Sequence, residues 1–190
     1  MPVFLGNEKK YLIETIDSTY VSSVGSYVSR FEEMMCEITG SSFAIAIVNG
    51  TNALHMSLIL AGVTDKDETL CQSLTFIATC NSIRYIGSKP IFIDIDKDTL
   101  GMSALALTEF LKSNAEIRSD GFTYNKKSGR RIKACVPMHT FGFPCRIDEI
   151  ASICERYNII LIEDAAESIG SYYKGKHTGT FGQLGTISFN

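Results

Sequence analysis

Short apolar runs alternate with stretches of helical periodicity along most of the chain. The predicted strands are apolar runs of about six residues, at 43–49, 69–74, 90–95, 133–139, 159–164 and 184–189. The predicted helices have apolar residues every three or four positions and cover 27–39, 51–62, 76–86, 104–117 and 147–157. Unbroken apolar strands separated by helices are typical of a parallel sheet that is buried on both faces. The pattern therefore predicts an α/β fold, a mostly parallel sheet with helices on both faces.

The polar segment 118–131 interrupts this alternation, and its glycines predict an excursion loop between two units. The basic run 125–133 lies mostly in this segment and holds no aromatic residue, so a solvated loop is the favoured interpretation. The net charge of -3 and the scattered Lys and Arg residues give no basis for a nucleic-acid partner.

Composition places the chain among soluble globular proteins, with 45% hydrophobic and 21% charged residues. No window approaches the roughly 18 apolar residues of a membrane span, and the first residues do not resemble a signal peptide. The six cysteines show no CxxC spacing, which predicts reduced thiols in a cytoplasmic protein and no zinc site. Cys145, next to a proline in a predicted turn, is the one candidate for a reactive thiol.

A candidate phosphate site lies where the strand 43–49 passes into the next helix. Gly50 permits a tight turn, and Thr51 and Asn52 open the helix, where free backbone N–H groups suit an anion. An ordinary helix cap is the simpler interpretation of these residues by themselves. The chain has neither GxGxxG nor GxxxxGK[ST], so dinucleotide and P-loop sites are disfavoured.

Acidic side chains follow the apolar strand 159–164 at its C-terminal end, where parallel sheets bind ligands. Glu163, Asp164 and Glu167 have no Lys or Arg between residues 158 and 173. A buried acid requires a positive partner or hydrogen bonds, and a cationic ligand such as a protonated ring nitrogen would satisfy Asp164. A capping acid on the following turn is an equally good interpretation.

Several stretches occur in the order and approximate spacing of one family, namely "NGTNALHMSLILAG", "TFIATCNSI", "PIFIDID", "MHTFGFPCRIDEI", "IEDAAESIGS" and "GTISFN". Together with "YVSSVGSYVSRFEE" at 20–33, they resemble the pyridoxal-phosphate-dependent sugar aminotransferases of the DegT/DnrJ/StrS type. The closest branch by resemblance acts on UDP-linked 4-keto amino sugars. The resemblance covers the whole chain and implies most of the large domain of a fold-type I transferase, truncated before a C-terminal small domain.

The resemblance also implies the role of each site residue. Thr51 and Asn52 would hold the phosphate of pyridoxal 5'-phosphate, with a contribution from Ser188. Phe76 would stack on the pyridine ring, although a core aromatic is the simpler interpretation of one Phe. Asp164 would pair with the protonated ring nitrogen, so that the cofactor is the missing positive partner.

Two further residues, Glu167 and His139, are weaker candidates for a role in the site. Glu167 occupies the place of a glutamine that bonds the phenolic oxygen in many members, where a carboxylate would repel a phenolate unless it is protonated. His139, at the end of the strand 133–139, is more simply a core or supporting histidine than a catalytic one.

The lysine that forms a Schiff base with the cofactor lies, by resemblance, about five residues after Ser188, beyond Asn190. Neither Lys174 nor Lys176 matches its position, so residues 1–190 by themselves are expected not to transaminate. The complete protein is expected to use a nucleotide-sugar substrate and an amino-acid donor, glutamate by family, and to form a homodimer.

Three alternatives stay open. A sugar dehydratase of the same fold has histidine in place of the lysine, at a position outside this sequence. A non-catalytic relative would bind pyridoxal phosphate or a sugar nucleotide as a sensor or partner domain. A doubly wound domain for another nucleotide is disfavoured because the glycine fingerprints are missing.

Overall fold

The computed structural model describes residues 3–189. It divides the chain into two compact units, residues 1–46 and 47–190, and each is described by itself. All the candidate site residues belong to the second unit.

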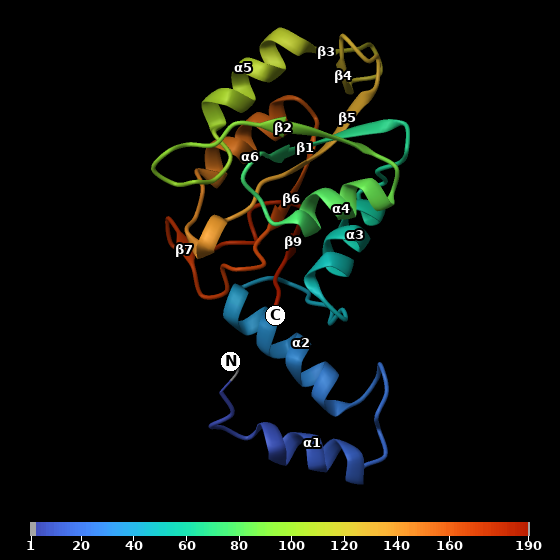
Figure 1. The fold of residues 1–190 in the computed structure, drawn as a ribbon, viewed down its shortest axis with the longest axis vertical. Helices are drawn as coiled ribbons and strands as arrows, with labels where there is room; N and C mark the ends of the chain where they lie inside the picture. Colours follow the sequence, from blue (N-terminus) through green and yellow to red (C-terminus); the bar gives the residue numbers. More distant parts are fainter. Residues whose placement is uncertain (1–2, 190) are drawn as a thin grey trace. The chain divides into compact units, whose positions relative to one another are not determined.

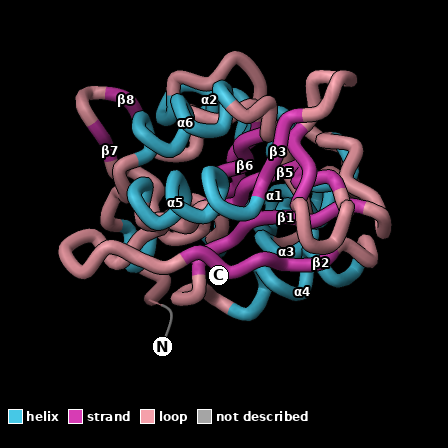
Figure 2. Tube along the Cα trace, turned by 90° about the horizontal axis from the view of Figure 1, so that it is seen from above, coloured by secondary structure: helices cyan, strands magenta, loops and turns pink. Residues whose placement is uncertain are grey.

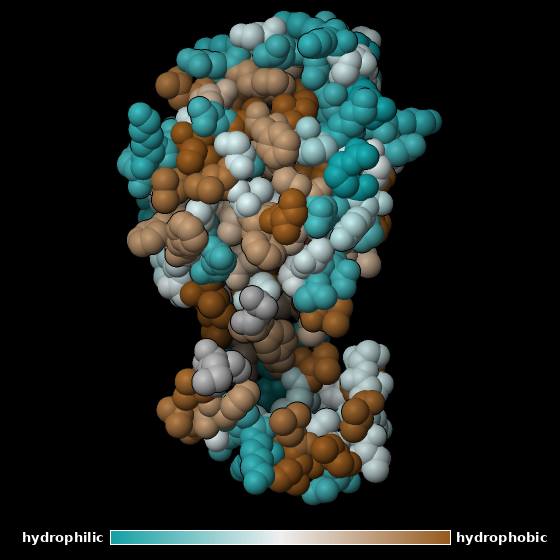
Figure 3. All heavy atoms as spheres, in the orientation of Figure 1, coloured by the Kyte–Doolittle hydropathy of each residue, from teal (hydrophilic) through white to brown (hydrophobic). Residues whose placement is uncertain are grey.

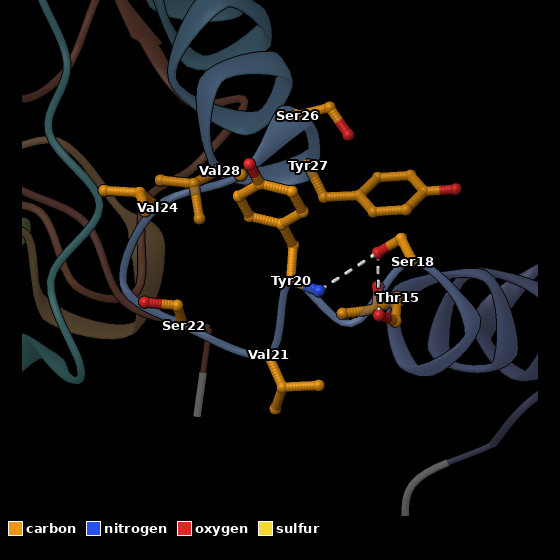
Figure 4. A pocket seen from close by; sticks show the side chains of 10 residues that line it. Thr15, Ser18, Tyr20, Val21, Ser22, Val24, Ser26, Tyr27 and Val28 are labelled. Carbon is orange, nitrogen blue, oxygen red and sulfur yellow. Dashed lines mark hydrogen bonds between the residues drawn. The ribbon is translucent and has the colours of Figure 1, made fainter.

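The first unit consists of two helices, α1 (Glu8–Asp17) and α2 (Ser26–Thr39). Helix α2 confirms the prediction for 27–39 and ends at Gly40 in the left-handed conformation (φ 73°), which glycine adopts without strain. Helix α1 was not predicted, and none of its residues is buried. The loop between the helices forms a hollow in which Tyr20 donates its backbone N–H to the Ser18 hydroxyl (Figure 4). The described residues that line this hollow are polar and apolar ones without an acidic or basic side chain.

The second unit is built on a sheet whose main strands are parallel (Figure 1). Their spatial order is β2 (Lys89–Ile93), β1 (Asp67–Gln72), β5 (Arg131–Val136), β6 (Ile160–Asp164) and β9 (Leu184–Thr186). An antiparallel hairpin of β3 (Ala115–Ile117) and β4 (Thr123–Asn125) joins the start of β5. A separate small hairpin is formed by β7 (Tyr172–Tyr173) and β8 (Lys176–His177).

Helices cover both faces of this sheet, as the alternation of patterns predicts (Figure 2). One face carries α3 (Gly50–Leu60) and α4 (Ile77–Tyr85), which pack around Leu54, Leu58 and Ile83. The opposite face carries α5 (Ala104–Asn114) and α6 (Ile147–Arg156), which pack around Leu107, Leu111 and other buried apolar side chains. A short turn, η1 (Thr140–Gly142), follows β5. The predicted fold class is thus confirmed.

Three predicted segments differ from the structure. The run 43–49 forms no strand, and its apolar side chains, such as Phe43 and Val48, are exposed, because no described strand pairs with it. The helix predicted for 104–117 ends at Asn114, and residues 115–117 become β3. The predicted loop 118–131 contains β4, which pairs with β3 and β5. In each case pairing between strands, which periodicity does not report, decided the outcome.

Among the residues that the structure describes, no helix is both long and apolar enough to cross a membrane.

Candidate active site

The first turn of α3 combines a conventional cap with free backbone donors. The side chain of Asn49 caps the helix, since its Oδ1 accepts the N–H of Asn52 at 2.9 Å. Within residues 3–189, the N–H groups of Gly50 and Thr51 have no acceptor. The cap and the anion site are therefore compatible, because the cap uses a different N–H group.

The serine at the far end of the sheet lies against this turn. A Cβ atom added at Gly50 would lie only 3.0 Å from both Cβ and Oγ of Ser188. Ser188 follows β9, whose residue Thr186 pairs with Asp164 of β6. The fold thus brings Ser188, 137 positions after Thr51 in the sequence, to the helix N-terminus, and glycine at position 50 leaves the space between them open.

Asp164 is almost completely buried, with 2% of its surface exposed. Its Oδ2 accepts the hydroxyl of Thr79 at 2.7 Å, and its Oδ1 accepts the N–H of Ala166 at 3.3 Å. Burial raises the pKa of the Asp164 carboxyl above its usual value, and the bond from Thr79 opposes that effect. The carboxylate is held in place, but its hydrogen bonds do not fully offset the cost of burying its negative charge.

Among residues 3–189, no Lys or Arg relieves this acid. Within residues 3–189, neither Asp164 nor Glu167 forms an ion pair with Lys or Arg. Of the neighbouring ionisable groups, His139 lowers the pKa of Asp164 and Glu167 raises it. A buried carboxyl with a second carboxyl nearby suits a cationic ligand, and the residues present therefore fit a protonated heterocycle.

Helix α4 connects Asp164 to the other predicted residues. Phe76 precedes the first residue of the helix and is 65% exposed, so its ring is available to a ligand and is not a core aromatic. Thr79 lies one turn further on and bonds both Asp164 and the Thr75 hydroxyl. The hydroxyl of Ser82 donates to the Thr51 carbonyl, which ties α4 to the start of α3.

Thr79 was not singled out by the sequence. The available signal was its position three residues after Phe76, which places both on the same side of one helical turn. A threonine there is unremarkable until the tertiary structure places Asp164 against it.

Glu167 is exposed and bonded to the loop after β5. Its Oε2 accepts the N–H of Phe141 at 2.8 Å. Phe141 has a left-handed backbone (φ 54°), an uncommon conformation for a side chain of this size, and Gly142 packs closely on the carbonyl of Glu167. One carboxylate oxygen of Glu167 thus holds the loop, and no described group bonds the other.

Apolar side chains are exposed over this unit, and apolar patches appear among polar ones on the face shown in Figure 3. The rings of Phe141 and Phe143, which flank Gly142, are each more than 60% exposed. The neighbourhood of Glu167 is therefore an apolar rim beside acidic groups.

The prediction of a reactive thiol at Cys145 is wrong. The side chain is fully buried, and burial raises its pKa to about 12, so the nucleophilic thiolate is absent at neutral pH. His139 is a core histidine, as the sequence indicates, and its Nε2 lies 3.0 Å from a carboxylate oxygen of Glu163. All six cysteines are free thiols.

Replacing Thr79 with Val is expected to destabilise the chain in a pH-dependent way. Valine keeps the shape of threonine but removes the donor that favours the ionised form of Asp164. The folded-state pKa of Asp164 then rises further above its unfolded value, so the stability associated with its proton is lost as pH increases. We expect a small loss in the free energy of unfolding near pH 4 and one on the order of 2 kcal/mol near pH 8, measured by urea denaturation.

Thr69→Val is the matched control for this measurement. Thr69 is also buried, but its hydroxyl bonds the neutral hydroxyl of Ser88 at 3.0 Å. Its loss should be the same at both pH values. An equal loss at both pH values for Thr79→Val would contradict the assigned link to Asp164.

The fold and these residues define an α/β domain with a buried acid and a helix N-terminus open to an anion, as in cofactor-binding transferases. A family model confirms this class, because the DegT/DnrJ/EryC1/StrS aminotransferase family matches residues 5–190. The chain belongs to that family, and the resemblance stated from the sequence is confirmed.

Individual relatives agree with this assignment. The chain is 37% identical over 188 residues to the GDP-perosamine synthase of Escherichia coli O157:H7, covering 99% of this chain and 47% of the relative. It is 40% identical over 189 residues to EpsN of Bacillus subtilis (strain 168), named as a candidate pyridoxal phosphate-dependent aminotransferase, covering 100% of this chain and 46% of that protein. The chain thus spans about half the length of the curated relatives it matches.

A solved structure shows the same architecture in an enzyme of different activity. A GDP-4-keto-6-deoxymannose-3-dehydratase with bound GDP-perosamine superimposes with a TM-score of 0.79 and 26% sequence identity. The alignment covers 98% of this chain and 45% of that structure.

Proposed function

We propose that the chain contributes the cofactor-binding half of a pyridoxal-phosphate-dependent aminotransferase that acts on a nucleotide-linked 4-keto sugar. The observation that carries the proposal is Asp164, a buried acid without a described Lys or Arg partner. The open N-terminus of α3, closed on one side by Ser188, supplies a matching place for an anion. Pyridoxal phosphate carries both a cationic ring nitrogen and a phosphate, and it satisfies both features.

Each residue would hold one part of the cofactor. The free N–H groups of Gly50 and Thr51, the side chains of Thr51 and Asn52, and the hydroxyl of Ser188 would bind the phosphate. The exposed ring of Phe76 would stack on the pyridine.

Two acids would act on the ring itself. Asp164, oriented by Thr79 and the N–H of Ala166, would keep the proton on the ring nitrogen. The free oxygen of Glu167 would approach the phenolic oxygen, with a proton shared between them. When bound, pyridoxal phosphate supplies a protonated ring that accepts the electron pair left as a proton leaves the substrate carbon.

The remaining parts of the proposal concern the whole protein. By analogy with its relatives it would take glutamate as amino donor, act in the cytoplasm and form a homodimer. It would also carry a small C-terminal domain and a lysine shortly after Ser188. The names of relatives mention GDP sugars, whereas the sequence resembles the UDP branch most. The activity test below therefore uses both UDP- and GDP-linked substrates.

Cofactor binding is tested by adding pyridoxal phosphate to the purified protein and following the absorbance and induced circular dichroism of the ring. We expect saturable binding that weakens when pyridoxal without phosphate is used. NAD serves as the control for a generic nucleotide-binding domain. Binding of NAD in place of pyridoxal phosphate would overturn the proposal.

The dehydratase is the second candidate, because a dehydratase is among the solved structures with this fold. The complete protein, incubated with a UDP- or GDP-linked 4-keto sugar, distinguishes the two by product mass. We expect an amino sugar to form only when glutamate is present. A deoxygenated sugar that carries no new nitrogen would instead establish the dehydratase.

A further inference from the structure

The buried carboxylate of Glu163 has no role in the ligand contacts proposed above, although it directly precedes Asp164. It is fully buried and accepts four hydrogen bonds. Its Oε1 accepts the N–H groups of Phe181 at 2.5 Å and Gly182 at 2.7 Å. Its Oε2 accepts the N–H of Gly179 at 2.8 Å and lies 3.0 Å from Nε2 of His139. All four partners can be donors, so the carboxylate is satisfied by acceptance alone.

The tautomer of His139 follows from its other ring nitrogen. Nδ1 lies 3.3 Å from the backbone N–H of Cys145, which can only donate, so Nδ1 is the acceptor. The ring proton of the neutral histidine is therefore on Nε2, where it is donated to Glu163. The backbone N–H of His139 also donates to the Asp164 carbonyl, so the ring and the strand are fixed together.

Glycines allow the segment after β8 to approach Glu163 so closely. Gly179 has a left-handed backbone (φ 85°). A Cβ at Gly182 would lie 2.5 Å from the Leu161 carbonyl oxygen, and a Cβ at Gly185 would lie 1.9 Å from the Gly179 carbonyl oxygen. A side chain at position 182 would push the segment away from β6, and one at position 185 would push Gly179 away from β9, so the converging N–H groups depend on these glycines.

This segment leads directly to Ser188. Thr186 pairs with Asp164 and donates its hydroxyl to the Glu163 carbonyl, and Ser188 follows two residues later against Gly50. Successive side chains of a strand point to opposite faces, so Asp164 and Glu163 serve different sides of β6.

We propose that Glu163 is a positioning residue that holds residues 179–182 and β9, and thereby places Ser188 against the N-terminus of α3. The carboxylate accepts the N–H groups of Gly179, Phe181 and Gly182, on which the turn converges, and His139 supplies its fourth donor. The inference rests on the proposed function for the identity of the anion, pyridoxal phosphate. The placement of Ser188 itself is a property of the chain without a ligand.

Glu163→Gln tests the proposal with almost no change in size. If the amide nitrogen takes the place of Oε1, it faces the N–H groups of Phe181 and Gly182. If it takes the place of Oε2, it faces Gly179 and the His139 proton, which cannot move to Nδ1 without opposing the N–H of Cys145. Either orientation leaves donors opposed, so we expect the turn to open.

The first readout is amide hydrogen exchange on the protein without cofactor. We expect residues 179–188 to lose protection by tenfold or more in Glu163→Gln, while β1 keeps its protection. Glu155→Gln, which makes the same chemical change on an exposed residue of α6, is the control and should change nothing. Unchanged protection of residues 179–188 in Glu163→Gln would overturn the proposal.

The second readout is the ³¹P chemical shift of bound pyridoxal phosphate. A phosphate held by Ser188 and the helix N–H groups should keep one shift between about pH 6 and about pH 8, whereas a loosened one should titrate near its ordinary pKa of about 6. We expect titration in Glu163→Gln and none in the wild type or Glu155→Gln. A purely structural role would leave the shift constant, and that outcome overturns the positioning role.

Variants at His139 keep the test decisive if Glu163→Gln lowers protection throughout the chain. His139→Gln retains one donor toward Glu163 and one acceptor toward Cys145, whereas His139→Leu removes both. We expect His139→Leu to lose protection locally at residues 179–182 and His139→Gln to restore it. Equal behaviour of the two variants would overturn the proposal. A wild-type protein that does not bind pyridoxal phosphate would contradict the proposed function, and the exchange measurements would still decide the role of Glu163.

Discussion

Asp164→Asn is expected to weaken pyridoxal phosphate binding by about 100-fold, on the order of 3 kcal/mol, because the variant removes one partner of a buried charge pair. Asparagine preserves the volume and still accepts the Thr79 hydroxyl, so the site keeps its shape. The loss should disappear for the carbocyclic cofactor analogue that lacks the ring nitrogen. Equal weakening for both cofactors would show that Asp164 does not contact the nitrogen.

The same substitution should have the opposite effect on the chain without cofactor at higher pH. Burial raises the folded-state pKa of Asp164 above its unfolded value, so its stabilising proton is fully present below about pH 4 and is lost as pH rises through the folded pKa. Asparagine does not titrate. The free energy of unfolding of Asp164→Asn should therefore increase relative to wild type between about pH 4 and about pH 8.

Urea denaturation across that range measures the effect, with the exposed Asp65→Asn as the control. The control should follow the wild type at every pH. If the free energy of unfolding of Asp164→Asn changes with pH in the same way as that of the wild type, then ionisation of the buried Asp164 does not destabilise the chain without cofactor. That result would contradict the proposed need for a cationic partner.

Gly50→Ala is expected to weaken pyridoxal phosphate by at least tenfold while leaving pyridoxal, which has no phosphate, unchanged. The added Cβ lies 3.0 Å from Cβ and Oγ of Ser188 and occupies the space proposed for the phosphate. Alanine is a better helix former than glycine and the backbone here is not left-handed, so the helix itself should not suffer.

Ser188→Ala distinguishes the space available for the phosphate from the hydrogen bond that the Ser188 hydroxyl would donate to it. It keeps the opening but removes one donor, so a loss of tenfold or less is expected, about the contribution of one hydrogen bond. Both affinities are measured by titration of the cofactor absorbance. A loss for pyridoxal equal to that for pyridoxal phosphate in Gly50→Ala would place the phosphate elsewhere.

The local pattern of apolar and polar residues was enough to predict the fold class and most of its elements. Alternating strand and helix patterns correspond to β1, β2, β5, β6 and β9 and to five of the six α-helices within residues 3–189, because burial on both faces of a sheet imposes unbroken apolar strands. The position of Asp164 after such a strand and of Thr51 at the start of a helix also follows from local pattern. These features depend on neighbours within a few residues.

Which residues meet in the site depends on contacts between segments far apart in the chain. Contacts between distant segments made Thr79 the partner of Asp164, placed Ser188 beside Gly50, and buried Cys145 so deeply that its thiol is inert. These contacts also give the adjacent acids Glu163 and Asp164 different surroundings. Asp164 is left without a described Lys or Arg partner, while Glu163 is satisfied by a turn that begins sixteen residues later. Pairing of this kind joins residues far apart in the chain, and therefore periodicity and composition do not report it.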